Sequence, residues 1–162
     1  MSKQLPQHVE VSVDVDADPN EVWSVISDPT RVGEWSLEAC GAEWISSGDV
    51  PFVGARFVGS NDAGRMKTWR RHCEILSCDA PRELSWRTVP KGFYRDSTTW
   101  RITLEPTAEG TRIHQSYDLT APDWLLRLIW HVMPTHRDRT AELEADLRRL
   151  GEVASGRQVS PA

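Results

Sequence analysis

The sequence predicts an α+β fold in which a seven-stranded antiparallel sheet wraps around one long C-terminal helix, with two short helices directly after the first strand. Two observations predict this fold. Apolar and polar residues alternate along seven segments that are separated by turns, as expected for strands with one buried face. A segment near the C-terminus instead repeats its apolar residues in steps of three and four, which is typical of a helix. The short connections favour antiparallel pairing.

The first strand is expected at 9–15, where valines alternate with polar residues. Asp18 follows as an N-cap with a proline at the first helical position, and Glu21 completes a capping box. Asp28 and the proline after it repeat this start, which ends the first helix after about two turns and begins a second. One strand is therefore followed by two short helices.

Six further strands are expected between turns that are rich in Gly, Pro, Asp and Asn. They are 42–46, 55–59, 65–76, 83–88, 94–105 and 111–120. Alternation places one set of mostly apolar side chains on a shared face of the sheet. The set includes Trp69, Cys73, Ile75, Leu84, Trp86, Trp100, Ile102, Leu104, Ile113, Tyr117 and Leu119. That face is expected to be dry.

The closing helix is expected from Pro122 to Leu150, with a kink at Pro134. Its apolar stripe consists of Leu126, Ile129, Met133, Leu143, Leu147 and Leu150, with His136 and Thr140 as polar interruptions. The charged residues of the helix, Arg139, Glu142, Glu144 and Asp146 among them, are assigned to a solvated face. The stripe is available to cover the dry face of the sheet.

Composition restricts the class of protein. The 162 residues, 39% hydrophobic and 27% charged, predict one globular domain at 8–151 between flexible ends at 1–7 and 152–162. A net charge of −5 argues against a nucleic-acid partner. No apolar run is long enough to span a membrane, and no signal-peptide pattern is present. Three cysteines without a C-x-x-C spacing are expected as reduced thiols, which indicates a cytoplasmic protein.

Three local motifs carry a family resemblance. The first is Ala17-x-Pro19-x-x-Val22-Trp23, followed by Asp28-Pro29 and Trp35. The second is Val53-Gly54-Ala55-Arg56-Phe57-x-Gly59-x-Asn61, and the third joins Trp69-x-x-x-Cys73-x-Ile75 to Pro81-x-x-Leu84-x-Trp86. With the order of the elements, they resemble the helix-grip fold of the START-like (SRPBCC) superfamily, in its bacterial polyketide cyclase/dehydrase and lipid-transport type. The resemblance implies an internal cavity between the sheet and the closing helix.

Residues expected to face such a cavity are the candidate ligand-binding residues. Aromatic rings would stack on flat or aliphatic ligands, and a few polar groups would orient them. The candidates are Trp35, Phe57, Trp69, Arg71, Trp86, Tyr94, Trp100, Tyr117, Ile129, Met133, His136 and Thr140. Ordinary core packing is the alternative for the aromatic residues, and a hydrogen bond to a strand carbonyl is the alternative for His136. Arg71 is alternatively expected to pair with Glu43 or Asp96.

We therefore expect a protein that binds a small hydrophobic or aromatic molecule, lipid- or polyketide-like, as a monomer or weak homodimer. Two alternatives stay open: a cofactor-independent enzyme of the polyketide cyclase or aromatase type, and a protein-interaction module that uses the groove. No catalytic residue is assigned. No cofactor is expected, and the absence of an H-E-x-x-H motif or a Cys/His cluster predicts no metal site.

Overall fold

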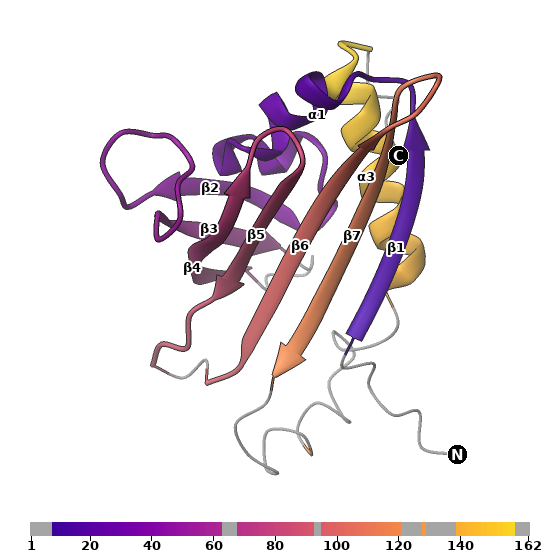
Figure 1. The fold of residues 1–162 in the computed structure, drawn as a ribbon. Helices are drawn as coiled ribbons and strands as arrows, with labels where there is room; N and C mark the ends of the chain where they lie inside the picture. The colour runs from indigo at the N-terminus through magenta and orange to yellow at the C-terminus, as the bar shows by residue number, and fades with distance from the viewer. Residues whose placement is uncertain (1–7, 63–67, 93–94, 121–127, 129–138, 158–162) are drawn as a thin grey trace.

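The structure is a computed structural model that describes residues 8–62, 68–92, 95–120, 128 and 139–157. Figure 1 shows one antiparallel sheet with the helices on one side of it. The elements are β1 (His8–Val15), α1 (Pro19–Ile26), the 3-10 helix η1 (Pro29–Glu34), β2 (Ala39–Trp44), β3 (Arg56–Asp62), β4 (Thr68–Asp79), β5 (Glu83–Thr88), β6 (Ser97–Pro106), β7 (Thr111–Thr120) and α3 (Thr140–Ala154). The predicted α+β fold with seven antiparallel strands is confirmed.

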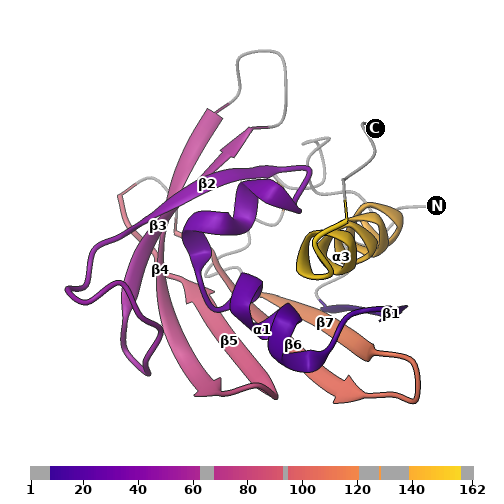
Figure 2. The same ribbon diagram turned by 90° about the horizontal axis from the view of Figure 1, so that it is seen from above.

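The sheet has the strand order β1-β7-β6-β5-β4-β3-β2. Strands β2 to β7 therefore form a meander, while β1 pairs with β7 at the far edge. The chain passes from one edge, β1, to the other, β2, through α1 and η1. Figure 2, viewed from above, shows how the sheet curves around α1, η1 and α3. We call the side on which these helices lie the inner face.

The two short helices begin as the sequence predicts. The Asp18 carboxylate accepts a hydrogen bond from the backbone N–H of Asn20 at 2.8 Å, and Glu21 accepts one from the N–H of Asp18 at 2.8 Å. Asp28 caps η1 by accepting from the N–H of Thr30 at 3.0 Å. Each carboxylate satisfies an N–H group that the helix itself leaves unpaired. The capping box is confirmed, and Trp35 follows directly as the C-cap of η1.

Several element boundaries differ from the prediction. Strands β5 and β7 have the expected bounds, but β3 continues through Asn61 and Asp62, where a turn was expected. The reason is pairing with an earlier start of β2: Ala39 lies opposite Asn61, and the N–H of Asp62 donates to the carbonyl of Glu38 at 2.9 Å. The expected helix is interrupted at Arg139, which is not helical: α3 begins at Thr140 and ends at Ala154, four residues beyond the expected end. The earlier part of the expected helix, with Ile129, Met133, His136 and the kink at Pro134, lies outside the described residues.

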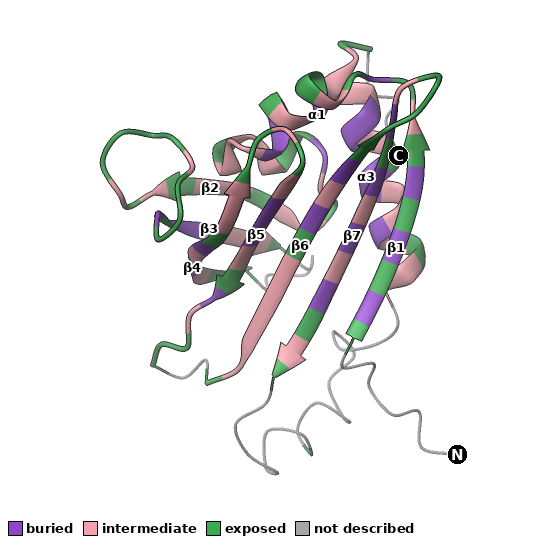
Figure 3. Ribbon diagram, viewed as in Figure 1, coloured by how far each residue is buried: buried purple, intermediate pink, exposed green. Residues whose placement is uncertain are grey.

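The packed core joins α3 to the β1 edge of the inner face. Leu143, Leu147 and Leu150 of α3 are buried, as the apolar stripe predicts. Helix α3 approaches β1 closely at Gly151, where an added Cβ would lie 2.6 Å from the Cβ of Val15. Figure 3 shows buried residues alternating with exposed ones along β1, and with exposed or intermediate ones along β7. No helix in the described part of the chain is both long and apolar enough to cross a membrane.

The assignment of Asp146 to a solvated helix face is wrong. Asp146 is 4% exposed, and its carboxylate accepts hydrogen bonds from the N–H of Leu37 at 2.9 Å and the hydroxyl of Ser36 at 3.2 Å. Asp146 precedes the buried Leu147 on α3. The segment that follows η1 covers the Asp146 side chain. Burial raises the pKa of Asp146 to about 6, although the bonds from Leu37 and Ser36 favour the anion.

Candidate functional site

Three aromatic side chains form a row across adjacent strands on the inner face. Trp86 on β5 lies opposite Trp100 on β6, which in turn lies opposite Tyr117 on β7. The two indoles stack with centroids 6.3 Å apart and planes inclined by 13°. The Trp100 and Tyr117 rings are 4.9 Å apart and tilted by 49°. We call these residues the aromatic row; cross-strand aromatic pairs of this kind stabilise a sheet and present flat apolar surface.

The two indoles of the aromatic row are less completely covered than their aliphatic neighbours, whereas Tyr117 is buried. Ile102 and Leu84, one position along the same face, are buried, whereas Trp86 and Trp100 are only half-buried. The described helices pack mainly elsewhere: α3 against β1, η1 against β2, and α1 near β6. Among the described elements, no helix makes an extensive contact with β4 or β5. The two indoles thus lie where the described helices contribute little packing.

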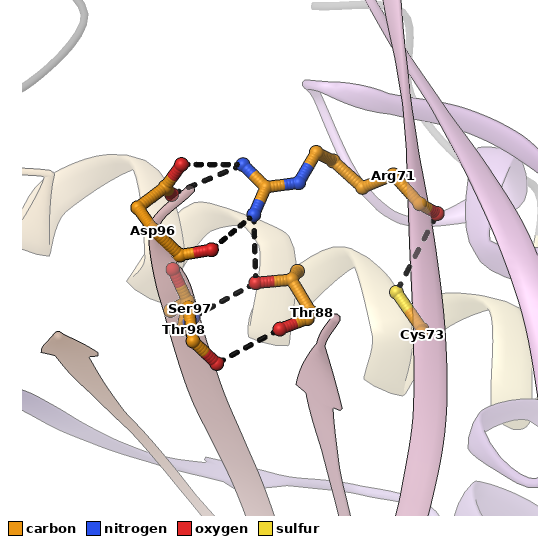
Figure 4. A network of polar contacts seen from close by, with 6 residues as sticks. All are labelled: Arg71, Cys73, Thr88, Asp96, Ser97 and Thr98. Atoms are coloured by element: carbon orange, nitrogen blue, oxygen red, sulfur yellow. Dashed lines mark hydrogen bonds and ion pairs between the residues drawn. The ribbon is translucent and has the colours of Figure 1, made fainter. Parts of the chain in front are cut away.

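A polar network lies beside the aromatic row, at the end of β5 (Figure 4). The Arg71 guanidinium donates through Nη1 to both carboxylate oxygens of Asp96, at 3.2 and 3.0 Å. Through Nη2 it donates to the Asp96 carbonyl and to the Thr88 hydroxyl oxygen, each at 3.0 Å. The Thr88 oxygen also accepts from the N–H of Thr98 at 2.8 Å. We call Arg71, Asp96 and Thr88 the Arg71 network.

The network shows which of the two residues considered as partners of Arg71 forms the ion pair. Its partner is Asp96, and Glu43 instead pairs with the outward-facing Arg70 at 2.9 Å. The side chains of Arg71 and Asp96 are only 12% and 14% exposed. Their charges compensate each other in a place where an isolated charge would be costly. Asp96 was expected inside a strand but precedes β6, so that both its carbonyl and its carboxylate reach Arg71.

The thiol of Cys73 also lies beside this network. Cys73 lies on β4 with the same orientation as Arg71, is 5% exposed, and its thiol donates to the carbonyl of Arg71 at 3.7 Å. Burial raises the pKa of the Cys73 thiol to about 12. The thiol is therefore neutral and unreactive, because the thiolate is the nucleophilic form.

Gln115 is a polar residue of the inner face that is not among the candidates predicted from the sequence. It lies on β7 between Ile113 and Tyr117, has the inner-face parity, and is 4% exposed. Within the described part of the chain, its Oε1 atom is buried without a hydrogen-bond partner. The signal was present in the sequence: a glutamine at an inward position of an otherwise apolar strand face. Trp35 provides the second such atom, Nε1, which is also buried without a partner among the described residues.

The structure brings some of the candidate residues together and separates others. Trp86, Trp100 and Tyr117 are in contact, and Arg71 joins them through Thr88, two residues after Trp86. Phe57 is buried on β3 and packs edge-on against Trp44, with centroids 6.0 Å apart. The remaining described candidates are dispersed: a buried Trp35 after η1, a half-buried Trp69 on β4, and a half-buried Thr140 at the start of α3. Tyr94, Ile129, Met133 and His136 lie outside the described residues.

Comparison with known proteins identifies a family. A family model described as polyketide cyclase/dehydrase and lipid transport matches residues 6–154. No curated protein matches the chain.

Solved structures share the fold. The chain is similar to protein MLL2253 from Mesorhizobium loti, with 19% identity, a TM-score of 0.67, and coverage of 94% of this chain and 99% of that one. The ginseng major latex-like protein 151 from Panax ginseng shows 13% identity, a TM-score of 0.64, and coverage of 94% and 97%. The Polyketide_cyc-like protein Cgl2372 from Corynebacterium glutamicum shows 26% identity, a TM-score of 0.52, and coverage of 92% and 83%.

Proposed function

The chain belongs to the polyketide cyclase/dehydrase and lipid transport family, and on that premise we propose that it binds a small hydrophobic or aromatic molecule against the inner face of its sheet. The observation that carries this proposal is the aromatic row. Two stacked indoles remain half-buried on a face whose aliphatic positions are closed. Covering exposed apolar surface stabilises a complex by roughly 25 cal/mol per Å².

The Arg71 network supports binding rather than catalysis. Its cation and its carboxylate bind each other, so they offer a fixed polar surface for orienting a ligand. Proton transfer would need a group whose pKa is matched to the task, and the neighbouring Cys73 thiol has a pKa of about 12. Free thiols at all three cysteines suit a protein of the cytoplasm.

We include the other candidate residues in the proposed site as its further lining. They are Trp35, Phe57, Trp69, Tyr94, Ile129, Met133, His136 and Thr140. The ligand is proposed to be lipid- or polyketide-like, and the domain that holds it to span 8–151.

A titration with N-phenyl-1-naphthylamine, a neutral apolar dye that brightens on leaving water, tests this function. We expect saturable binding, and a Trp100→Leu variant that binds the dye about tenfold more weakly because a stacking surface is lost. Trp23→Leu, on α1, is the matched control and should leave the dye affinity unchanged. Absence of saturable binding, or equal losses in the two variants, contradicts the proposal.

A further inference from the structure

Gln115 is a polar side chain placed next to the aromatic row. It precedes Tyr117 by two residues on β7, so both side chains leave the same face of the strand. Its cross-strand neighbours are Ile102 on β6 and Val11 on β1, and both are buried. Gln115 therefore presents a carboxamide to an apolar part of the inner face, one position along from Trp100 and Tyr117.

The unpartnered oxygen of Gln115 destabilises the folded protein when no ligand is bound. A buried acceptor without a donor loses the hydrogen bonds that it makes to water in the unfolded chain, and this loss destabilises the folded state. A glutamine that served only the fold would have its oxygen bonded, as the large majority of buried polar atoms do. The Oε1 atom of Gln115 has no partner in the described part of the chain. A ligand that brings a donor would remove this cost.

The surroundings of the aromatic row favour a ligand without charge. Arg71 is compensated by Asp96, the buried Cys73 thiol is protonated, and Gln115 itself is neutral. A carboxylate placed here would lose its hydration on burial and would gain little from a cation already bound to Asp96. A neutral hydroxyl carries no charge to bury and needs no cation as a partner.

We propose that Gln115 recognises a hydroxyl group of the ligand, and hence that the bound molecule is a neutral hydroxylated compound, a phenol or an alcohol with an apolar body. The ligand O–H donates to Gln115 Oε1 while the apolar body packs on Trp86 and Trp100. A hydroxyl also accepts, so it fits either orientation of the carboxamide. This inference rests on the proposed function.

The test compares three naphthalenes of nearly equal size by isothermal titration calorimetry: 2-naphthol, 2-methoxynaphthalene and 2-naphthoate. The wild-type protein should bind 2-naphthol about tenfold more tightly than 2-methoxynaphthalene, which lacks the donor, and 2-naphthoate most weakly. Gln115→Met, which keeps the length of the side chain, should abolish the preference for 2-naphthol over 2-methoxynaphthalene. Ser116→Ala, on the other face of β7, is the control and should keep the preference.

The outcomes distinguish failure of the role proposed for Gln115 from failure of the proposed ligand binding. Equal affinities of wild-type protein for 2-naphthol and 2-methoxynaphthalene would overturn the role of Gln115 while binding itself stands. A preference that persists in Gln115→Met, with a lowered melting temperature, would show that Gln115 is structural. If none of the three compounds binds, the proposed function fails together with the inference. The wild-type comparison needs no variant, so it holds even if Gln115→Met folds poorly.

Discussion

Two regions of the same inner face are built differently. At the β1 edge, Val11, Ile113 and Leu147 are fully or almost fully buried, and α3 approaches β1 closely at Gly151. Across β4, β5 and β6, the same alternation instead presents half-buried indoles and a charged pair that is held by hydrogen bonds. We call the first region the aliphatic edge and the second the aromatic centre.

The difference shows that the same alternation of side chains along the strands can serve stability in one region and the proposed ligand binding in another. Aliphatic side chains in close contact with a helix provide stability, since each buried methylene contributes about 0.8 kcal/mol. The aromatic centre has less helix packed on it, and it keeps its charges satisfied internally through Asp96 and Thr88. We therefore expect mutations at the aliphatic edge to affect folding, and mutations at the aromatic centre to affect binding more than folding.

The largest effect is expected at Leu147, which is 0% exposed. Leu147→Ala should lower the free energy of unfolding by about 3–4 kcal/mol, because it leaves a cavity between α3 and the sheet. Glu144→Ala, on the same helix with its side chain partly in water, should change it by less than about 0.5 kcal/mol. Urea denaturation measures both, and similar effects at the two positions would mean that the packed face of α3 is assigned wrongly.

A somewhat smaller loss is expected when the Arg71 network is broken. Arg71→Met should lower the free energy of unfolding by about 2–3 kcal/mol, because it leaves the Asp96 carboxylate largely buried without its cation. Adding Asp96→Leu should restore part of the loss, since no uncompensated charge then remains. A double-mutant cycle in urea measures this recovery, and strictly additive losses would contradict the coupling of the two residues.

A pH-dependent effect of about 2–3 kcal/mol is expected from Asp146, since one unit of pKa difference is worth about 1.4 kcal/mol. Its pKa rises from 3.8 to about 6 on folding, so its protonated form favours the folded state. The stability that it contributes is fully present below about pH 4 and is lost as the pH rises through about 6. Asp146→Asn, which does not titrate, should match the wild type near pH 4 and be more stable than it near pH 7.5.

Other charged groups face Asp146 and remain in the Asp146→Asn variant. Burial raises the pKa of Glu38, which has an ion pair with Arg139, and Arg139 in turn binds Glu142 at 3.1 Å. Because Glu38 shifts in the same direction, some pH dependence should persist. Thermal melts at several pH values measure the difference between the two proteins, and a less stable variant near pH 7.5 would show that the bonds from Ser36 and Leu37 outweigh the burial of the anion.

The smallest effect on stability is expected in the aromatic centre. Trp86→Leu should lower the free energy of unfolding by less than about 1.5 kcal/mol, although it removes more atoms than Leu147→Ala. The reason is that the indole is only half-buried before any ligand binds. Urea denaturation of the ligand-free protein measures this change in the free energy of unfolding. A loss as large as that of Leu147→Ala would remove the distinction between the two regions.

The sequence predicted much of the fold because its signals are local. Alternation and turn residues placed β5 and β7 correctly, and the capping carboxylates placed α1 and η1. Alternation also put Trp86, Trp100 and Tyr117 on one face. That these three lie opposite one another depends on strand register, which alternation does not specify.

The parts that could not be predicted depend on partners far away in the sequence. Asp146 is buried because the backbone N–H of Leu37 and the hydroxyl of Ser36 reach it from another segment, and nothing near Asp146 in the chain indicates this. Gln115 is different, since its inward parity was visible, and only its polarity kept it out of the expected apolar face. The choice of Asp96 over Glu43 by Arg71 required the three-dimensional structure.

The central claim is that the aromatic centre binds the ligand. The most direct measurement follows the indole N–H signals of the eight tryptophans in a ¹H–¹⁵N NMR spectrum during a titration with 2-naphthol, with signals assigned by single substitutions. We predict that Trp86 and Trp100 show the largest saturable shifts, because they stack on each other on the inner face, while Trp44 at the β2 edge shifts little. Largest shifts at Trp44, or no saturable shift at Trp86 and Trp100, would contradict the account.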